Sequence, residues 1–262
     1  MKPSNYTFSP ADVAVHSDWF KAWFNHPAYL KLYAHRSLEE AEQTIATLLK
    51  FITIESPNPK ALDIACGSGR HAVALARHGF KVTANDLSST LLAEAQKLAE
   101  SRNLSLTFTR IDMREITFEQ EFDLIVQLFT SFGYFENDDE DKVVLQRVAR
   151  ALKPNGWYVL DFLNEHLVRN TLQPETRRTL GELDVLEQRM LFGERVVKSI
   201  TLCENGITHR FIESVRLYSQ AELTAMLNAV GLCVHHYLGD YDGGAFERHA
   251  SPRLILIAQK QS

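Results

Sequence analysis

The sequence predicts an α/β fold, a mostly parallel sheet with helices on both faces. Strand-like and helix-like segments alternate from Lys60 onward, a pattern typical of such sheets. With 262 residues, of which 45% are hydrophobic and 23% charged, the chain can form a core of about 150–200 residues and carry an appended lobe. An apolar segment that runs into the glycine-rich turn Cys66–Arg70 indicates where the first core strand meets a helix.

The N-terminal part, residues 1–55, is expected to be helical. Aromatic side chains recur there at helical spacing, namely Trp19, Phe20, Trp23 and Phe24. Ser37 and Glu40 form a capping-box pattern that starts a second helix, and Pro57 limits its extent.

The core, residues 56–169 and 218–262, is expected to supply the main sheet. Five apolar runs predict strands: Lys60–Ala65, Phe80–Asn85, Leu104–Ile111, Phe122–Leu128 and Trp157–Phe162. Helices are expected over Arg70–His78 and after the capping residues Ser88 and Asn137, and Pro154-Asn155-Gly156 predicts a turn. Ser219 and Glu222 begin a further helix, and Cys233–Leu238 with Arg253–Gln259 complete the sheet as a hairpin pair.

Residues 170–217 interrupt the alternation and predict an antiparallel β insertion packed over one edge of the main sheet. Three segments have strand character: Val185–Leu191, Arg195–Leu202 and Thr208–Leu217. Asn205-Gly206 between the last two is a strong hairpin signal, because both residues tolerate the positive φ of a type I′ turn.

The glycine-rich turn is typical of a nucleotide-cofactor site. Gly67 and Gly69 lack a Cβ, so their backbone can approach a ligand closely, and the next helix points free N–H groups toward it. Asp86 and Asp112 follow the second and third predicted strands, where carboxylates could bind a ribose and an adenine.

Two cofactor classes compete on these residues. Gly67, Gly69 and Ala72 satisfy the relaxed dinucleotide fingerprint, with Asp86 roughly 20 residues further on. Asp63 inside the first strand and the second acid, Asp112, favour a different class. Together these residues resemble the class I, Rossmann-like methyltransferases that use S-adenosylmethionine.

The resemblance narrows to a small-molecule-type subgroup with an antiparallel β insertion, through three segments: Phe129–Phe135, Leu160–Asn164 and Gly239–Gly243. It implies a seven-stranded sheet whose last strand is antiparallel. It also implies that residues 1–55 act as a helical lid and that residues 170–217 lie over the acceptor pocket.

Carried over residue by residue, the resemblance implies roles at the cofactor. Asp63 would organise the glycine loop, Asp86 would accept both ribose hydroxyls, and Arg36 would pair with the methionine carboxylate. Leu87 and Met113 would sandwich the adenine. The full expected set is Tyr33, Arg36, Asp63, Ala65, Gly67, Gly69, Asp86, Leu87, Asp112, Met113, Leu128 and Phe129.

The expected reaction is methyl transfer by in-line displacement to a nitrogen or oxygen acceptor. A small-molecule acceptor is favoured, because the net charge is −5 and no basic stripe suits nucleic acid. A methyltransferase acting on tRNA or protein, and a cofactor-binding protein without turnover, stay as alternatives. A general base is optional in this chemistry, and the candidates near the strand ends are Tyr134, Asn164, Tyr241 and His166.

Composition sets further expectations. No His or Cys spacing suggests a metal site, and three cysteines, Cys66, Cys203 and Cys233, fit a reducing compartment. With neither an apolar signal region nor 18 consecutive apolar residues, no membrane association and a cytoplasmic location are expected. The sequence does not determine the oligomeric state.

Overall fold

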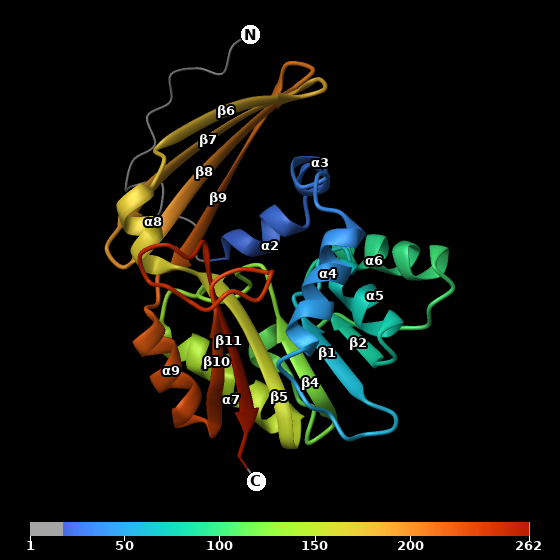
Figure 1. Ribbon diagram of the computed structural model, residues 1–262. Helices are drawn as coiled ribbons and strands as arrows, with labels where there is room; N and C mark the ends of the chain where they lie inside the picture. The colour runs from blue at the N-terminus through green and yellow to red at the C-terminus, as the bar shows by residue number, and fades with distance from the viewer. Residues whose placement is uncertain (1–17, 262) are drawn as a thin grey trace.

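The computed structural model describes residues 18–261, which form a seven-stranded sheet with helices on both faces and a separate four-stranded sheet (Figure 1). Residues 1–17 of the predicted N-terminal lid lie outside the described part. None of the helices in residues 18–261 is both long enough and apolar enough to cross a membrane.

The main sheet has the strand order β10-β11-β5-β4-β1-β2-β3. Its strands are β1 Lys60–Ile64, β2 Lys81–Asn85, β3 Thr107–Thr109, β4 Phe122–Gln127, β5 Leu152–Leu163, β10 Leu232–Leu238 and β11 Arg253–Lys260. The first five are parallel, whereas β11 is antiparallel to both of its neighbours. The predicted fold class and the antiparallel last strand are therefore confirmed.

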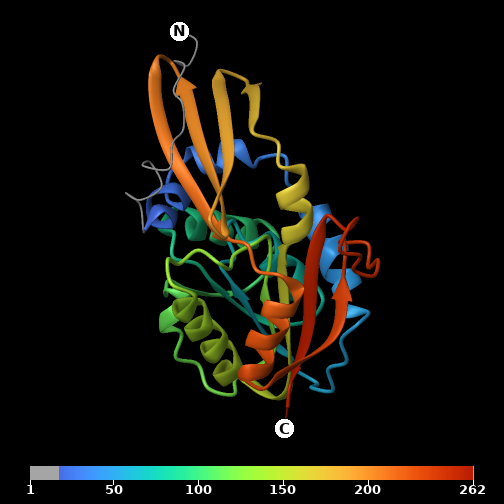
Figure 2. The same cartoon turned by 90° about the vertical axis from the view of Figure 1, so that its left-hand side faces the viewer.

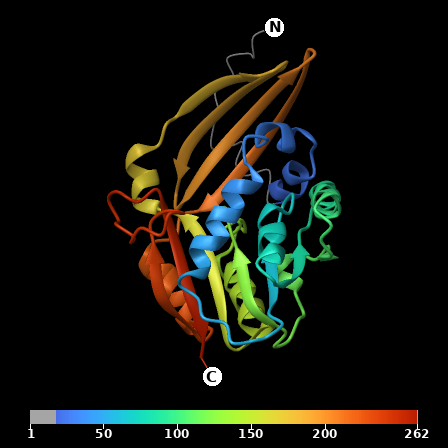
Figure 3. The same ribbon diagram turned by 45° about the vertical axis from the view of Figure 1, so that its right-hand side comes forward.

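Alternation along the strands explains why helices cover both faces. In β4, Leu124 and Val126 face one apolar cluster while Ile125 faces the other. Helices α4 Leu38–Leu49 and α5 Arg70–Arg77 supply the first cluster, and α7 Asp138–Ala151 and α9 Gln220–Ala229 supply the second. Figure 3 shows α4 lying across the sheet.

Most of the predicted helix starts are confirmed. Ser219 and Glu222 make both bonds of the capping box at α9, and Ser37 accepts the Glu40 N–H at α4. Ser88 caps α6 Ser89–Ser101, and Asn137 caps α7. Aromatic residues of the N-terminal segment lie on α2 Trp19–Phe24, which α3 Ala28–Leu32 follows.

The four-stranded sheet is larger than predicted. It consists of β6 Glu175–Leu180, β7 Leu183–Phe192, β8 Arg195–Glu204 and β9 Ile207–Arg216, all antiparallel. Strand β6 was not predicted, because it is an exposed edge strand of charged residues without apolar alternation. Helix α8 Glu165–Thr171, which connects β5 to this sheet, was also not predicted.

The insertion lies elsewhere than predicted. It does not cover an edge of the main sheet: it follows the carboxyl end of β5 and rises beyond that end of the core, with α2 beside it (Figures 1 and 2).

Two further predictions are wrong in extent. Strand β3 is shorter than Leu104–Ile111, and Pro154-Asn155-Gly156 lies within β5, where Asn155 takes a positive φ of 61°.

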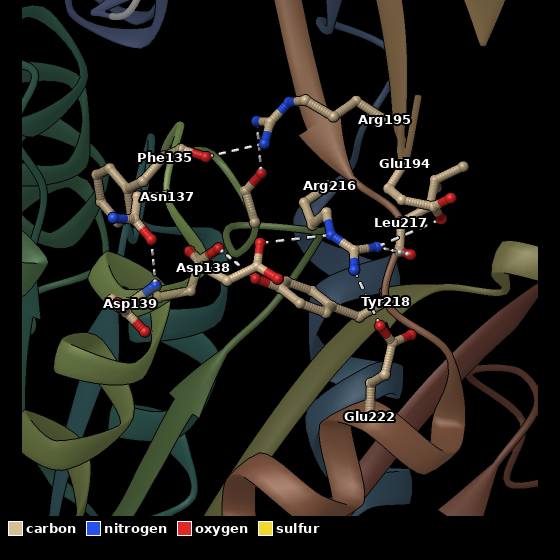
Figure 4. A network of polar contacts seen from close by, with 12 residues as sticks. Phe135, Asn137, Asp138, Asp139, Glu194, Arg195, Arg216, Leu217, Tyr218 and Glu222 are labelled. Carbon is tan, nitrogen blue, oxygen red and sulfur yellow. Dashed lines mark hydrogen bonds and ion pairs between the residues drawn. The ribbon is translucent and has the colours of Figure 1, made fainter. Parts of the chain in front are cut away.

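Polar contacts anchor the base of the insertion to the core (Figure 4). The Arg195 guanidinium donates to the carbonyl oxygens of Gly133, Tyr134 and Phe135 at 2.8–3.1 Å. Arg216 donates to Glu222 at 2.9 Å, and the adjacent Tyr218 hydroxyl donates to buried Asp141 at 2.8 Å. These contacts hold β8 against the loop that follows β4, and the end of β9 against α9 and α7.

Candidate active site

The glycine-rich turn adopts the backbone geometry that its composition predicts. Ala65, Gly67 and Gly69 all have positive φ values, of 56°, 57° and 80°. A Cβ at Gly67 would meet nothing within 4 Å, so this residue borders open space. A Cβ at Gly69 would lie 2.7 Å from the Ala95 Cβ, so Gly69 is required for packing of α5 against α6.

A first cavity lies at this turn, and it collects most of the predicted cofactor residues. Eleven of the twelve line it: Tyr33, Arg36, Asp63, Ala65, Gly67, Asp86, Leu87, Asp112, Met113, Leu128 and Phe129. Gly69 does not, since it contacts Ala95 instead. Residues from distant parts of the chain therefore meet here, as the parallel strand order requires.

The two acids that follow β2 and β3 differ in their surroundings. Asp86 is buried, and its carboxylate accepts the N–H groups of Gly67 and Ser88, both at 2.8 Å. Burial raises the pKa of Asp86, although these bonds oppose the shift. Asp112 accepts three bonds from Arg114, which outweigh the effect of burial and lower its pKa.

Two buried polar atoms of residues that line this cavity, Asp63 Oδ2 and His71 Nε2, have no hydrogen-bond partner in the described part of the chain. Burial, and then the nearby Asp86, raises the pKa of Asp63 to about 8. Burial lowers the pKa of His71 most, and repulsion by the positive charges of Arg70 and Arg36 lowers it further, to about 3. The imidazole is therefore neutral. Sequence reasoning missed Arg70 and His71, although Arg70 ends the glycine-rich turn and His71 follows it.

Two guanidinium groups approach one aromatic ring in the same cavity. The Cζ atoms of Arg36 and Arg70 lie 4.6 and 5.3 Å from the Phe129 ring centroid. Burial, and then repulsion by Arg36, lowers the pKa of Arg70. An anionic group bound between them would relieve this repulsion.

The Phe129 ring is held by a strained turn. Phe129 and Thr130 both have positive φ values, 56° and 63°, which are unfavourable for residues with side chains of this size. Fully buried Asp161 braces the turn: its carboxylate accepts the Phe129 N–H at 2.7 Å, and its carbonyl accepts the Thr130 N–H at 3.1 Å. Arg253 donates to the same carboxylate at 2.8 Å.

A second cavity lies between the insertion, α8 and the N-terminal helices. Six residues line both cavities, namely Phe24, Tyr29, Tyr33, Arg36, Phe129 and Tyr134. The inner face of the insertion contributes Arg189, Val196, Lys198, Glu213 and Val215. The two cavities are thus neighbours that share a partly aromatic wall.

The four candidate general bases are separated by the structure. Tyr134 lines both cavities, and burial raises the pKa of its phenol. Asn164 caps α8 and donates to the carbonyls of Arg248 and Ser251, so it lies outside both cavities.

Tyr241 and His166 likewise lie outside both cavities. The Tyr241 hydroxyl donates to Asp161 at 2.7 Å, and its ring stacks on Phe129 from behind the cavity wall, with centroids 5.4 Å apart. His166 pairs with His249 at 2.9 Å. Among residues 18–261, no group of three or more His, Cys, Asp or Glu side chains is placed to hold a metal ion.

Comparisons with known proteins agree with this fold and site. A family model described as a methyltransferase domain matches residues 61–156. The putative methyltransferase YqeM of Bacillus subtilis is 38% identical over 209 residues, which cover 77% of this chain and 84% of that protein. An N,N-dimethyltransferase of a dTDP-amino sugar from Streptomyces venezuelae is 24% identical over 201 residues, covering 72% and 83%.

Among solved structures, a S-adenosylmethionine-dependent methyltransferase from Clostridium acetobutylicum superposes with a TM-score of 0.76 at 20% identity, over 90% of this chain and 97% of that one. The fold and the glycine-turn cavity define a methyltransferase of class I. The chain belongs to the S-adenosylmethionine-dependent methyltransferase family, and it is an enzyme that uses this cofactor.

The residues of the first cavity fit the cofactor. Gly67 leaves room beside the backbone, Asp63 Oδ2 and His71 Nε2 lack partners, and two arginines lie where an anion would separate them. S-adenosylmethionine offers an ammonium group, hydroxyl donors and a carboxylate, which complement these groups.

Proposed function

We propose that this methyltransferase binds S-adenosylmethionine in the first cavity and a small-molecule acceptor in the second, and that the methyl group passes between them to a nitrogen or oxygen atom. The observation that carries this proposal is the shared wall: six residues line both cavities. The S-adenosylmethionine sulfonium supplies an activated methyl group and a good leaving group.

At the adenosine end, Asp86 would accept the ribose hydroxyls. Its two oxygens already accept the Gly67 and Ser88 N–H groups, and each oxygen has a further lone pair. Asp112 lines the cavity while held by Arg114, in a position suited to an adenine amine. Leu87 and Met113 would pack on the two sides of the ring.

At the methionine end, four side chains would act together. The Ala65 carbonyl and Asp63 would bind the ammonium group, Asp63 acting through water, and Gly67 would let this part of the cofactor lie against the backbone. Arg36 would pair with the carboxylate, and we add Arg70 and His71 to this end of the site. Leu128, Phe129 and Tyr33 would line the path toward the acceptor.

Orientation supplies much of the catalysis in such a site. Holding the nucleophile in line with the methyl group can contribute roughly 7–11 kcal/mol without any proton transfer. The braced turn at Phe129 and Thr130 would keep the shared wall rigid while both molecules are bound. Of the four candidate bases, Tyr134 is the one that faces both cavities, so we propose it as the side chain that contacts the acceptor.

Residues 1–55 would act as a lid together with the insertion, residues 170–217, over the acceptor pocket. Several contacts connect them, including an ion pair between Lys31 of α3 and Glu204 of β8 at 2.6 Å and a hydrogen bond that the Trp23 indole N–H donates to Glu213 of β9 at 2.7 Å. A lid joined in this way would exclude water from the displacement.

The test measures methyl transfer from labelled S-adenosylmethionine into three fractions in parallel: a metabolite extract, total tRNA and total protein. Label is expected in the metabolite fraction. Asp86→Ala is the control with weakened cofactor binding, because removing this carboxyl acceptor should cost about 1.5–3 kcal/mol of binding free energy. Asp86→Asn, which keeps one acceptor oxygen, should lose less.

Label confined to tRNA or protein would refute the small-molecule proposal. Cofactor binding without transfer into any fraction would favour the alternative of a binding protein without turnover.

A further inference from the structure

We propose that the acceptor molecule carries an anionic group, a carboxylate or a phosphate, which the second cavity binds on its insertion side. This inference rests on the proposed function and adds the chemical class of the substrate. Three observations support it: a row of charged side chains on the insertion, an excess of cations among the residues that line the cavity, and an indole N–H without a hydrogen-bond partner among the described residues.

The row of charges crosses the inner face of the insertion. Arg189 of β7 lies opposite Lys198 of β8, and Lys198 lies opposite Glu213 of β9, so all three side chains share one face. All three line the second cavity. The Glu213 carboxylate is already engaged, because it pairs with Lys198 at 2.5 Å and accepts the Trp23 N–H at 2.7 Å.

Cations exceed acids at this wall. Arg36, Arg189, Lys198 and Arg253 line the cavity, whereas Glu213 is its one lining acid among the described residues. Two buried acids that do not line the cavity pair with these cations: Glu187 pairs with Arg189 at 2.7 Å, and Asp161 pairs with Arg253 at 2.7 Å. Counting both, four positive charges still face three negative ones, although the whole chain has a net charge of −5.

Such a local excess attracts an anion. Charge of one sign in a cleft with apolar walls gives a stronger potential than the same charge in water. Arg36 also borders the cofactor cavity, where it would meet the methionine carboxylate. The ammonium group, which S-adenosylhomocysteine also carries, would balance the charge of that carboxylate, so the bound cofactor product leaves the excess of cations in place. An ammonium form of an amine acceptor would be repelled by the same field.

The unpaired donor is the Trp19 indole. Its Nε1 is buried and has no hydrogen-bond partner among residues 18–261, and Trp19 lines the second cavity but not the first. An unsatisfied buried N–H costs about 1–3 kcal/mol. A cofactor in the first cavity does not border this side chain, whereas an acceptor in the second cavity would, and we propose that an oxygen atom of the acceptor accepts this N–H.

The remaining wall is apolar and suits the body of the same molecule. Leu163, Val168 and Leu172 come from β5 and the α8 region, and Val196 and Val215 come from the insertion. An acceptor with an apolar body and an oxygen-rich anionic end would satisfy both parts of the cavity.

The experiment titrates the protein, saturated with S-adenosylhomocysteine, with four probes that share a phenyl ring: benzoate, phenyl phosphate, benzyl alcohol and benzylamine. Calorimetry should show benzoate or phenyl phosphate binding at least tenfold more tightly than benzyl alcohol, with benzylamine weakest. The tighter of the two anions identifies carboxylate or phosphate as the preferred group.

Two variants connect the preference to the cavity. Trp19→Phe keeps an aromatic ring and removes the N–H. Arg189→Gln removes one cation of the cavity wall. Glu187, the ion-pair partner of Arg189, still has Arg178 and Lys198 nearby in this variant, so its charge is not left unpaired. Each should reduce the preference for the anion at least threefold while S-adenosylhomocysteine affinity is unchanged. Trp157→Phe is the matched control, because its indole N–H bonds to the Thr53 carbonyl away from both cavities.

Benzyl alcohol or benzylamine binding as tightly as the anions would overturn the inference, and so would a protein that binds S-adenosylhomocysteine but none of the probes. An anion preference that survives both variants would also overturn it. Failure to bind S-adenosylhomocysteine in the first titration would instead refute the proposed cofactor site, and the inference with it.

Discussion

At the residue scale, the cofactor cavity combines two carboxyl groups that are both buried, Asp63 and Asp86. Asp86 is stabilised by backbone N–H groups, whereas Asp63 Oδ2 has no partner. This difference explains why burial, reinforced by Asp86, raises the pKa of Asp63 to about 8. In the absence of cofactor, Asp63 is therefore mostly protonated at pH 7.

This pKa predicts a pH dependence of stability. The folded pKa of about 8 exceeds the ordinary value of 3.8. Between about pH 4 and pH 8 the folded protein therefore keeps a proton on Asp63 that the unfolded chain has already released. The contribution of Asp63 to stability is thus complete at low pH and is lost as the pH rises through this window. The slope is at most about 1.4 kcal/mol per pH unit.

Asp63→Asn should remove this slope, because asparagine resembles the protonated carboxyl group. Urea unfolding of both proteins without cofactor at pH 5, 6 and 7 should show the variant gaining stability relative to the parent as the pH rises. Asp139→Asn, at an exposed residue of α7, is the control. A constant difference between variant and parent would contradict the protonated state of Asp63.

At the element scale, the β8–β9 hairpin connects the insertion to the N-terminal helices. Asn205 and Gly206 have φ values of 52° and 79°, as the predicted type I′ turn requires. Next to this turn, Glu204 pairs with Lys31 of α3. The hairpin tip therefore contacts α3, whose Tyr29 lines both cavities.

Shortening this hairpin should change acceptor methylation and leave cofactor binding intact. Deleting Cys203, Glu204, Ile207 and Thr208 brings the Asn205-Gly206 turn onto the paired residues Leu202 and His209 and preserves the strand alternation. Calorimetry should give a S-adenosylhomocysteine affinity within about twofold, while transfer into the metabolite extract changes in rate or product.

Lys31→Ala is the control for the lost ion pair. Both side chains are substantially exposed, so the pair should contribute less than about 1 kcal/mol. A folded hairpin variant that no longer binds S-adenosylhomocysteine would show that the insertion contributes to cofactor binding. That result would contradict the proposal that the insertion serves the acceptor.

At the scale of the whole molecule, cofactor binding should stabilise the fold, because the first cavity collects residues from β1, β2, the turn after β4 and the N-terminal helices. S-adenosylhomocysteine at 100 times its dissociation constant should add about 2.7 kcal/mol, or roughly 5–11 °C in Tm for a domain of this size. NAD should give no shift, since Asp63 and Asp112 favour the adenosylmethionine class. A shift with NAD alone would contradict the assigned cofactor.

The sequence alone determined the local chemistry of the core. Alternating segments predicted the sheet, the glycine turn predicted the first cavity, and eleven of the twelve expected cofactor residues line that cavity. This worked because such signals are local: a strand, a turn and a helix are specified by neighbouring residues, and parallel strands bring their carboxyl ends to one edge.

Only the tertiary structure decided which residues meet across the chain. Asn164 and Tyr241 carry suitable groups, but Asn164 donates to the Arg248 carbonyl and Tyr241 donates to Asp161, outside the first cavity. His71 and Arg70, in contrast, line that cavity. The second cavity joins α2, α8 and the insertion, so no local pattern could predict its charge excess or the unpaired Trp19 indole. Periodicity reports which face of an element is apolar, but the partner of each polar side chain depends on how distant elements pack, and that is a property of the folded chain.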